Sequence, residues 1–341
     1  MNEVLIIAEA GVNHNGDIAT AKKLIDAAAD AKVDFVKFQT FKADTIVSPE
    51  AKKASYQKAN MNDEGDSQYQ MLKKLELSDK DHQELMAYCN SKGVKFFSTA
   101  FDVDGLEYLN SLNFSCFKVP SGEITNYPYL VKVASFRKPV ILSTGMANIT
   151  EVKDAVKVLT SHGVNLIDIT ILHCNTEYPT PMEHVNLMAM HHIANELSVK
   201  IGYSDHTLGI EVPIAAVALG ATVIEKHFTL DRNLPGPDHK ASLEPEELAH
   251  MVRSIRNIQK AISGSGKKET SPSEAKNKSI ARKSIHLNKA VKRGEKLNEE
   301  DLIPLRPGHG ISPMEWQNVV GKKVLKDLDK LSLLLPQDLE D

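Results

Sequence analysis

Short β-rich segments alternate eight times with amphipathic segments of helical length between Val4 and Ile262. The predicted strands are Val4–Ala8, Phe35–Phe38, Lys95–Ser98, Cys116–Val119, Val140–Ser143, Thr170–His173, Lys200–Tyr203 and Val223–Glu225. The helices predicted to follow them are, in order, Ile18–Ala31, Lys80–Ser91, Asp104–Asn110, Tyr129–Ala134, Thr150–Ser161, Asn186–Ala194, Ile210–Ala218 and Pro245–Ile262. Parallel strands need such crossover connections, and eight units in roughly 260 residues are typical of a TIM (β/α)8 barrel. We therefore predict an α/β TIM barrel, with a doubly wound open sheet as the alternative.

The chain changes character after the last predicted helix. A polar segment rich in Gly, Ser and Pro begins at Ser263, which indicates a domain boundary. Beyond it, short strand and turn signals occupy about 60 residues, a size that is only marginally stable alone. We predict a barrel domain over residues 1–265, a linker over 266–281 and a small second domain over 282–341.

One connection within the predicted barrel is unusually long. It runs from Phe41 to Leu77 and contains an acidic stretch, Asp63–Asp66. Long loops of barrels are often functional, so we expect this connection to contribute to a site.

The charge balance and the cysteines exclude several classes of protein. Lys and Arg number 41 against 45 Asp and Glu, a formal net charge of −4. Without a long basic run, neither nucleic acid nor an anionic membrane is an expected partner. The three cysteines lack a Cys-x-x-Cys spacing, which argues against a disulfide framework or a zinc cluster and favours a reducing compartment. No segment approaches the ~20 apolar residues of a membrane span, so we expect a cytoplasmic protein.

The carboxyl ends of the predicted strands are rich in polar residues, and these ends form the active site of a TIM barrel. The polar residues at these ends include Glu9, Lys37, Gln39, Ser98, Thr99, Lys118, Ser121, Glu123, Ser143, Thr144, His173, Asn175, Thr176, Ser204, Asp205, His206, Glu225, Lys226 and His227. We expect many of these side chains to converge on one pocket.

Two lysines, Lys37 and Lys118, occupy corresponding positions in the second and fourth predicted strands. A single strand lysine is most often a paired structural charge. Two of them beside the hydroxyls of Ser121, Ser143 and Ser204 predict a pocket for a small ligand that carries phosphate and carboxylate groups. A Schiff-base lysine is the competing interpretation, and it requires a lowered lysine pKa.

Two histidines, His206 and His227, end the last two predicted strands and should lie side by side. Either one alone would usually be structural, but the pair with Glu9 and Glu225 nearby indicates a metal site. Two imidazoles with oxygen donors suit Mn²⁺ or Mg²⁺ that keeps water ligands.

Three further carboxylates could bind sugar hydroxyls or transfer protons: Glu123, Glu225 and Asp238. Pairing with a neighbouring lysine is the structural alternative for each of them.

Several motifs together resemble the sialic acid synthases. They occur in that family's order and cover nearly the whole chain: Ala8–Gly16, Val36–Phe41, Phe117–Glu123, Ser143–Met146, Leu172–Pro181, Gly202–Gly209, Ile224–Asp231, Gly236–Ser242 and Arg306–Ser312. The last motif falls in a C-terminal region that resembles the family's antifreeze-like (SAF) domain. The resemblance implies that the barrel is followed by such a domain.

The resemblance also implies roles for individual residues. His206 and His227 match the family's metal ligands, normally occupied by Mn²⁺. Acidic residues implicated in catalysis or sugar binding match Glu9, Glu123, Glu225 and Asp238. Positions that contact phosphoenolpyruvate or the sugar match Lys37, Gln39, Lys118, Ser121, Ser143, Thr176, Tyr178 and Ser204. Thr176 stands where other members have Asn. Arg306 matches the arginine that one subunit of a domain-swapped homodimer contributes to its partner's site.

The implied reaction is a metal-dependent condensation of phosphoenolpyruvate with N-acetylmannosamine and water, giving N-acetylneuraminic acid and phosphate by C–O cleavage. The partners would be phosphoenolpyruvate, an N-acylated hexose and a second copy of the chain. A legionaminic or pseudaminic acid synthase, acting on a 6-deoxy-diacetamido hexose, is the nearest alternative. A Schiff-base aldolase and a non-catalytic carbohydrate-binding protein are alternatives of other classes.

Overall fold

The computed structural model describes residues 3–61, 65 and 67–340. Asp63 and Asp66, which bound the acidic stretch of the long connection, lie outside the described residues. The contacts divide the chain into two compact units, Met1–Gly264 and Ser265–Asp341. No helix of the described residues is both long enough and apolar enough to cross a membrane.

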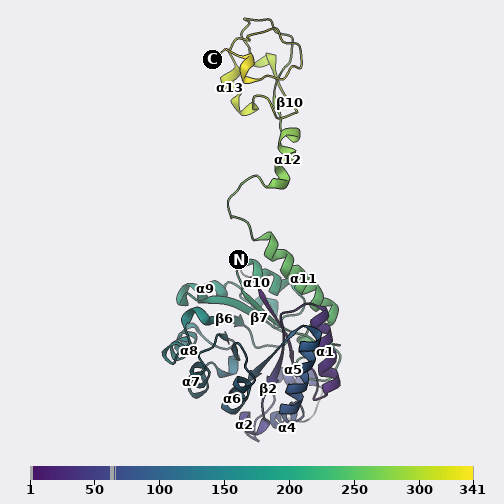
Figure 1. Cartoon of the computed structure of the whole chain (residues 1–341), viewed down its shortest axis with the longest axis vertical. Coiled ribbons are helices and arrows are strands. Elements are labelled where there is room, and N and C mark those ends of the chain that lie inside the picture. The colour runs from purple at the N-terminus through teal and green to yellow at the C-terminus, as the bar shows by residue number, and fades with distance from the viewer. Residues whose placement is uncertain (1–2, 62–64, 66, 341) are drawn as a thin grey trace. The chain divides into compact units, whose positions relative to one another are not determined.

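The first unit is built on eight parallel strands (Figure 1). They are β1 (Leu5–Gly11), β2 (Phe35–Thr40), β3 (Lys95–Ala100), β4 (Phe117–Val119), β5 (Val140–Ser143), β6 (Ile169–Cys174), β7 (Lys200–Asp205) and β8 (Val223–His227). The hydrogen-bonded order is β3-β2-β1-β8-β7-β6-β5-β4, so the first strand pairs with the last. Because β3 and β4, the two ends of that order, also contact each other, the sheet is a nearly closed barrel. The predicted TIM barrel is confirmed, and the open-sheet alternative is wrong.

Helices surround the barrel (Figure 1), and at least one helix of eight or more residues follows each strand. They are α1 (Ile18–Asp30), α5 (Asp79–Lys92), α6 (Val103–Ser111), α7 (Tyr127–Ser135), α8 (Ile149–Ser161), α9 (Ala189–Leu197), α10 (Glu211–Ala218) and α11 (Pro245–Ala261). Side-chain caps fix several starts: Asp17 accepts from two backbone N–H groups of α1, and Asn148 and Glu151 form a capping box on α8. The buried face of α11 consists of Leu248, Met251, Val252 and Ile255, the spacing of one helical stripe.

Several predicted boundaries differ from the structure by up to three residues. β1 continues past Ala8 to Gly11 because Glu9 and Gly11 still pair with β2. β8 continues past Glu225 to His227 because Lys226 and His227 still pair with β1. The helix predicted from Asn186 begins at Ala189 instead. Asn186 has a φ of 47°, in the left-handed region, so it cannot belong to the helix.

The long connection after β2 is not an irregular loop. It contains three short helices, α2 (Ala43–Ile46), α3 (Ser55–Met61) and α4 (Gln68–Lys73). Its apolar side chains form a small cluster of their own, in which Phe41, Met71 and Leu75 are buried with Val12 from the end of β1. This cluster gives the connection a defined place beside the strand ends.

The second unit has its own small core. Strands β9 (Ser284–Leu287) and β10 (Leu302–Leu305) pair antiparallel, and the short helix α13 (Trp316–Val319) contributes a buried valine. Nine buried apolar residues form this core: Ile285, Leu287, Val291, Leu297, Leu302, Val319, Val324, Leu334 and Leu339. The residues 266–281 that we predicted as a linker include α12 (Pro272–Ala281), whose start is fixed by a capping box between Ser271 and Glu274. None of the residues of α12 is buried, so the helix adds nothing to this core.

Candidate active site

The strand register brings charged side chains together inside the barrel. Glu9 is the Cα partner of Lys37, and Ser204 is the partner of Glu225. Successive side chains of a strand point to opposite faces, so residues two apart share the interior, as Glu225 and His227 do. The carboxyl ends of the strands therefore present a continuous polar surface to the inside of the barrel.

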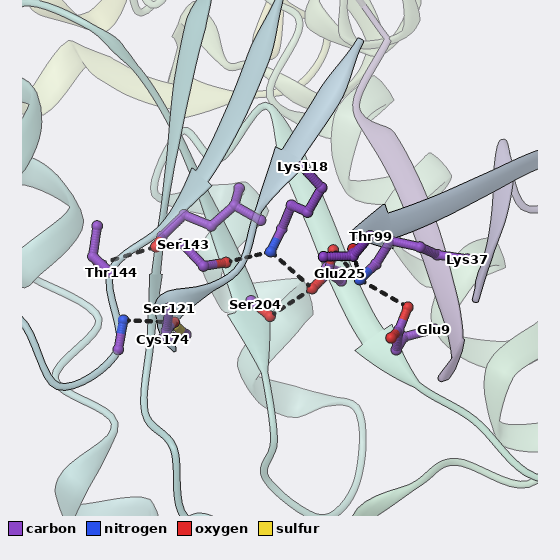
Figure 2. Close-up of polar contacts among 12 residues, drawn as sticks. Glu9, Lys37, Thr99, Lys118, Ser121, Ser143, Thr144, Cys174, Ser204 and Glu225 are labelled. Carbon is purple, nitrogen blue, oxygen red and sulfur yellow. Dashed lines mark hydrogen bonds and ion pairs between the residues drawn. The ribbon is translucent and has the colours of Figure 1, made fainter. Parts of the chain in front are cut away.

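Lys37 is the centre of a buried charge cluster (Figure 2). Its Nζ lies 2.9 Å from Oε2 of Glu9 and 3.4 Å from Oε2 of Glu225, and it donates to Oγ1 of Thr99 at 3.0 Å. The Lys37 side chain is 4% exposed, so these contacts replace nearly all of its hydration. Such a cation is available to an anionic ligand without a solvent shell to remove.

Lys118 completes the cluster from the opposite side (Figure 2). It donates to Oγ of Ser143 at 2.7 Å and lies 3.5 Å from Oε1 of Glu225. Glu225 also accepts a hydrogen bond from Ser204 at 3.1 Å. The carboxylate of Glu225 therefore lies between two lysines, and the cluster holds two cations and two carboxyl groups.

The two carboxyl groups of this cluster have opposite pKa shifts. Burial raises the pKa of Glu9 to about 7, and Glu225 adds to the increase while Lys37 opposes it. Burial would also raise the pKa of Glu225, but Lys118 and Lys37 together outweigh it and lower that pKa to about 2. One carboxylate thus stays ionised while the other can exchange a proton near neutral pH, a division typical of acid–base sites.

The lysines also differ from each other. Burial disfavours the charge of Lys37, but Glu225 and Glu9 outweigh it and raise the pKa of Lys37. For Lys118 burial prevails, and its pKa is lowered despite the attraction of Glu225. Lys37 is accordingly a fixed cation, a state that opposes its use as a Schiff-base nucleophile.

His206 and His227 lie side by side at the carboxyl ends of the neighbouring strands β7 and β8, with ring centroids 5.5 Å apart. Nδ1 of His206 hydrogen-bonds the carbonyl of Asn175, which only accepts, so the proton is on Nδ1 and the lone pair is on Nε2. Tyr178 donates its hydroxyl to that Nε2 at 3.0 Å. Nδ1 of His227 is buried and has no hydrogen-bond partner among the described residues.

These two rings fit a divalent metal as partial ligands. Burial lowers the pKa of His206 to about 4 and lowers that of His227 well below its usual value, so both imidazoles are neutral, the state that binds metals. The described residues contain no group of three His, Cys, Asp or Glu side chains arranged to hold a metal. The donor set is therefore an open pair, whose remaining positions would be filled by water or substrate.

A cavity of about 660 Å³ connects these groups. Fourteen predicted site residues line it: Glu9, Lys37, Gln39, Lys118, Ser121, Glu123, Ser143, Thr176, Tyr178, Ser204, His206, Glu225, His227 and Asp238. Arg306 belongs to the second unit, where its Nε donates to the carbonyl of Ala281 at 2.9 Å. The structure brings these fourteen barrel residues together in one site.

Three of the lining residues have further contacts or shifted pKa values. Ser121 accepts from the backbone N–H of Gly145 at 2.9 Å. Burial raises the pKa of the half-buried Glu123, against the hydrogen bond that Asn126 donates. Burial alone raises the pKa of Asp238 to about 7. Asp238 thus resembles Glu9 as a carboxyl group that can change protonation near neutral pH.

Some strand-end residues that we expected in the pocket lie elsewhere. Asp205 and Lys226 pair with each other, and His173 bonds the carbonyl of Val185; none of the three lines the cavity. The physical reason is alternation: Asp205 and Lys226 immediately precede the inward-facing His206 and His227, so they point outward.

Other functional contacts were missed from the sequence. The carbonyl of Asn175 orients His206, and the apolar side chains Ile46, Met71 and Leu72 from the long connection line the cavity. Met71 and Leu72 lie in α4, but their place in the wall depends on packing with Val12, which no local pattern in the sequence predicts. A backbone contact such as that of Asn175 leaves no signal in side-chain chemistry.

Residues 24–268 match the NeuB family, and residues 282–340 match the SAF domain. The chain belongs to the NeuB family. It is 52% identical to an N,N'-diacetyllegionaminic acid synthase of Campylobacter jejuni over 98% of this chain and 99% of that protein. It is 49% identical to a protein of the same name from Legionella pneumophila, over 98% and 94% of the two chains. The solved N-acetylneuraminic acid synthetase of Leptospira borgpetersenii is 36% identical, with a TM-score of 0.70, and the match covers 81% of this chain and 90% of that one. The family and the SAF domain predicted from the motifs are confirmed.

Proposed function

We propose that this NeuB-family protein condenses phosphoenolpyruvate with a 6-deoxy-diacetamido hexose, giving a legionaminic-type sugar acid and phosphate. The motifs alone put N-acetylmannosamine first. The two relatives that are 52% and 49% identical, both named N,N'-diacetyllegionaminic acid synthase, favour the other acceptor. The observation that carries the proposal is a single cavity with a charged floor and an apolar wall.

The charged floor suits the phosphoenolpyruvate. Lys37 and Lys118 are both buried cations, and Ser143 and Ser204 add hydroxyls beside them. A ligand with a carboxylate and a phosphate can pair with both lysines and accept from the hydroxyls. Fixed at both ends, it would present its nucleophilic C3 in one orientation, which lowers the entropic part of the barrier.

His206 and His227 would hold a divalent cation, Mn²⁺ or Mg²⁺. When bound, the metal supplies Lewis-acid polarisation of the acceptor's aldehyde oxygen. The Tyr178 hydroxyl beside His206 is placed to hydrogen-bond the acceptor.

Glu225 and Glu9 would stabilise the positive charge and accept the proton that the reaction generates. As C3 of phosphoenolpyruvate bonds to the aldehyde carbon, positive charge develops at C2, and the ionised Glu225 stabilises it. Water then adds to C2 and gives a proton to Glu9, whose pKa of about 7 suits a general base at neutral pH. The C2–O bond of the resulting intermediate breaks, and phosphate leaves with the former bridging oxygen and the proton of the C2 hydroxyl. Glu9 gives its proton to the alkoxide oxygen that derives from the aldehyde.

The apolar wall suits the far end of the acceptor. Val12, Ile46, Met71, Leu72 and Phe101 line the cavity and pack together. With the aldehyde placed beside the phosphoenolpyruvate, the C6 end of the sugar would meet this wall. A methyl group there releases water from apolar surface, whereas a hydroxyl must lose hydrogen bonds; the expected preference is about 10- to 100-fold.

The proposal includes a cytoplasmic homodimer in which Arg306 of one subunit binds the N-acyl group in the other's site. This part is supported by the motif around Arg306 in the SAF domain.

The test is a phosphate-release assay with phosphoenolpyruvate and a panel of acceptors: N-acetylmannosamine, its 6-phosphate and 6-deoxy-diacetamido hexoses of manno and altro configuration. We expect the highest kcat/KM with a 6-deoxy-diacetamido hexose. Met71→Gln should reduce the preference for the 6-deoxy sugar about tenfold, while Met71→Leu, the matched apolar control, should preserve it. A higher kcat/KM with N-acetylmannosamine would refute the acceptor assignment but leave the condensation intact.

The Schiff-base alternative has a separate test. Borohydride reduction in the presence of pyruvate should leave Lys37 and Lys118 unmodified by mass spectrometry. A stable adduct on Lys118, whose pKa is lowered by burial, would support an aldolase instead.

A further inference from the structure

A second buried charge pair lies outside the cavity, on the outer face of β7 and β8. Nζ of Lys226 is 2.5 Å from Oδ2 of Asp205 and donates to the carbonyl of Thr207 at 2.6 Å. Both charged side chains are 0% exposed. Neither lines the cavity, so neither can touch a substrate there.

This ion pair forms hydrogen bonds with Thr207, the residue that follows His206. Asp205 precedes the histidine, and its carboxylate accepts from both the N–H and the hydroxyl of Thr207, at 3.1 and 2.9 Å. Lys226 binds the carbonyl of the same threonine. Three consecutive residues, 205 to 207, are therefore held by one ion pair.

The same pair joins the two strands that carry the imidazoles. Asp205 and Lys226 are Cα partners in the parallel β7–β8 ladder. His206 and His227 each follow one member of the pair, and alternation directs both rings to the interior. The ion pair therefore fixes the relative position of the two residues whose rings lie 5.5 Å apart.

Stability alone does not explain the pair. Removing two charges from water costs several kcal/mol for each ion, and apolar residues of similar volume often stabilise a protein as well or better. A buried pair does, however, specify one geometry, because any shift of register separates the charges. Because the pair lies on the strands that carry His206 and His227, that geometry also fixes the positions of the two imidazoles.

We propose that Asp205 and Lys226 are positioning residues that hold His206 and His227 in the geometry that binds the divalent metal. This inference rests on the metal site of the proposed function. Outer contacts that orient metal ligands typically contribute 10- to 100-fold to metal affinity.

The test is isothermal titration of the full-length protein with MnCl₂. The double variant Asp205→Asn/Lys226→Met removes both charges, and the asparagine retains an oxygen that can accept from Thr207. We expect its Kd for Mn²⁺ to increase about 10- to 100-fold, while the urea midpoint changes little. Thr207→Val removes the hydroxyl that donates to Asp205 and leaves the ion pair intact, so the Kd for Mn²⁺ should increase to a smaller extent. This variant provides the test if the double variant does not fold.

The matched control is Arg256→Met/Asp34→Asn, which removes an ion pair of 2.8 Å at the other end of the barrel. Its Kd for Mn²⁺ should equal that of the wild type. The positioning role would be overturned if the wild type binds Mn²⁺ and the folded Asp205→Asn/Lys226→Met and Thr207→Val variants bind it with a Kd within twofold of the wild-type value. The metal site itself would still be supported by that result. A wild-type protein that binds no divalent cation would overturn both.

Discussion

The two ends of the barrel both contain ion pairs, but the charged side chains at the two ends differ in their exposure to solvent. At the amino end, Arg256 pairs with Asp34 at 2.8 Å, and the two side chains remain 21% and 31% exposed. Arg256 also donates to the carbonyl of Val4, and Asp34 accepts from the N–H of Ile6. At the carboxyl end, the side chains of Lys37, Lys118, Glu9 and Glu225 are only 2% to 6% exposed.

The difference favours the carboxyl end as the place of the proposed chemistry. The amino-end charges keep part of their hydration and bond the backbone, so they hold the first strand in place at little cost. The carboxyl-end charges are desolvated and mutually dependent, and the pKa of Glu9 is raised to about 7 while that of Glu225 is lowered to about 2. Ionic interactions are strongest in such a site, where a substrate can use them. In TIM barrels the carboxyl face is indeed the catalytic one.

Metal removal should have the largest effect on activity. Dialysis against EDTA should abolish turnover, because His206 and His227 would lose the cation that polarises the aldehyde, and added Mn²⁺ should restore it. Steady-state phosphate release measures the effect. If elemental analysis shows that the protein is free of metal and activity is nevertheless full, the proposed role of the metal in catalysis is wrong.

Lys118→Met should lower kcat/KM for phosphoenolpyruvate about 10²- to 10³-fold, because it removes one desolvated cation from the floor. Glu225 keeps Lys37 and Ser204 as partners, so the urea midpoint should change little. A loss of stability that accounts for the loss of activity would mean that the carboxyl end, like the amino end, is structural.

Asp238→Asn should change the pH dependence of stability. The pKa of Asp238 is raised in the folded protein, so ionisation opposes folding: the native state is penalised as pH rises from about 4 to about 7. The amide cannot ionise. The unfolding free energy of the variant relative to wild type should therefore increase by up to about 4 kcal/mol between pH 4 and pH 8. Urea titrations at the two pH values measure it, and a pH-independent difference would show that Asp238 is not desolvated.

Arg256→Met should have the smallest effect, and on stability alone. Losing the partly exposed pair with Asp34 and the bond to Val4 should cost about 1–2 kcal/mol of unfolding free energy. The kcat/KM should stay within twofold of wild type, since Arg256 touches nothing at the carboxyl end. A large catalytic defect in this variant would erase the distinction between the two ends.

Much of this division was predictable from the sequence, since the eightfold alternation predicts the barrel and the polar strand ends predict its active face. Along each strand, successive side chains point to opposite faces of the sheet, yet this pattern does not identify the partner of a given side chain. Lys37 and Lys226 are both strand lysines, and the sequence alone did not separate the one that lines the cavity from the one that pairs with Asp205 behind it. That distinction depends on burial and on strand register, which are properties of the assembled sheet.

The long connection after β2 marks another limit. Its length predicted a functional role, but its apolar wall depends on tertiary contacts of Met71 and Leu75 with Val12, far away in sequence. The α12 helix was missed for a different reason: the Ser271–Glu274 capping box that starts it lies in a segment whose composition is that of a linker.

The most direct test of the account follows the bridging oxygen of phosphoenolpyruvate. With ¹⁸O in that position and a 6-deoxy-diacetamido hexose as acceptor, mass spectrometry of the products shows which bond breaks. We predict that the label leaves entirely with phosphate, because water attacks C2 and the C2–O bond is cleaved. Label retained in the nine-carbon product, or no acceptor-dependent phosphate at all, would contradict the condensation that we assign to the carboxyl end of the barrel.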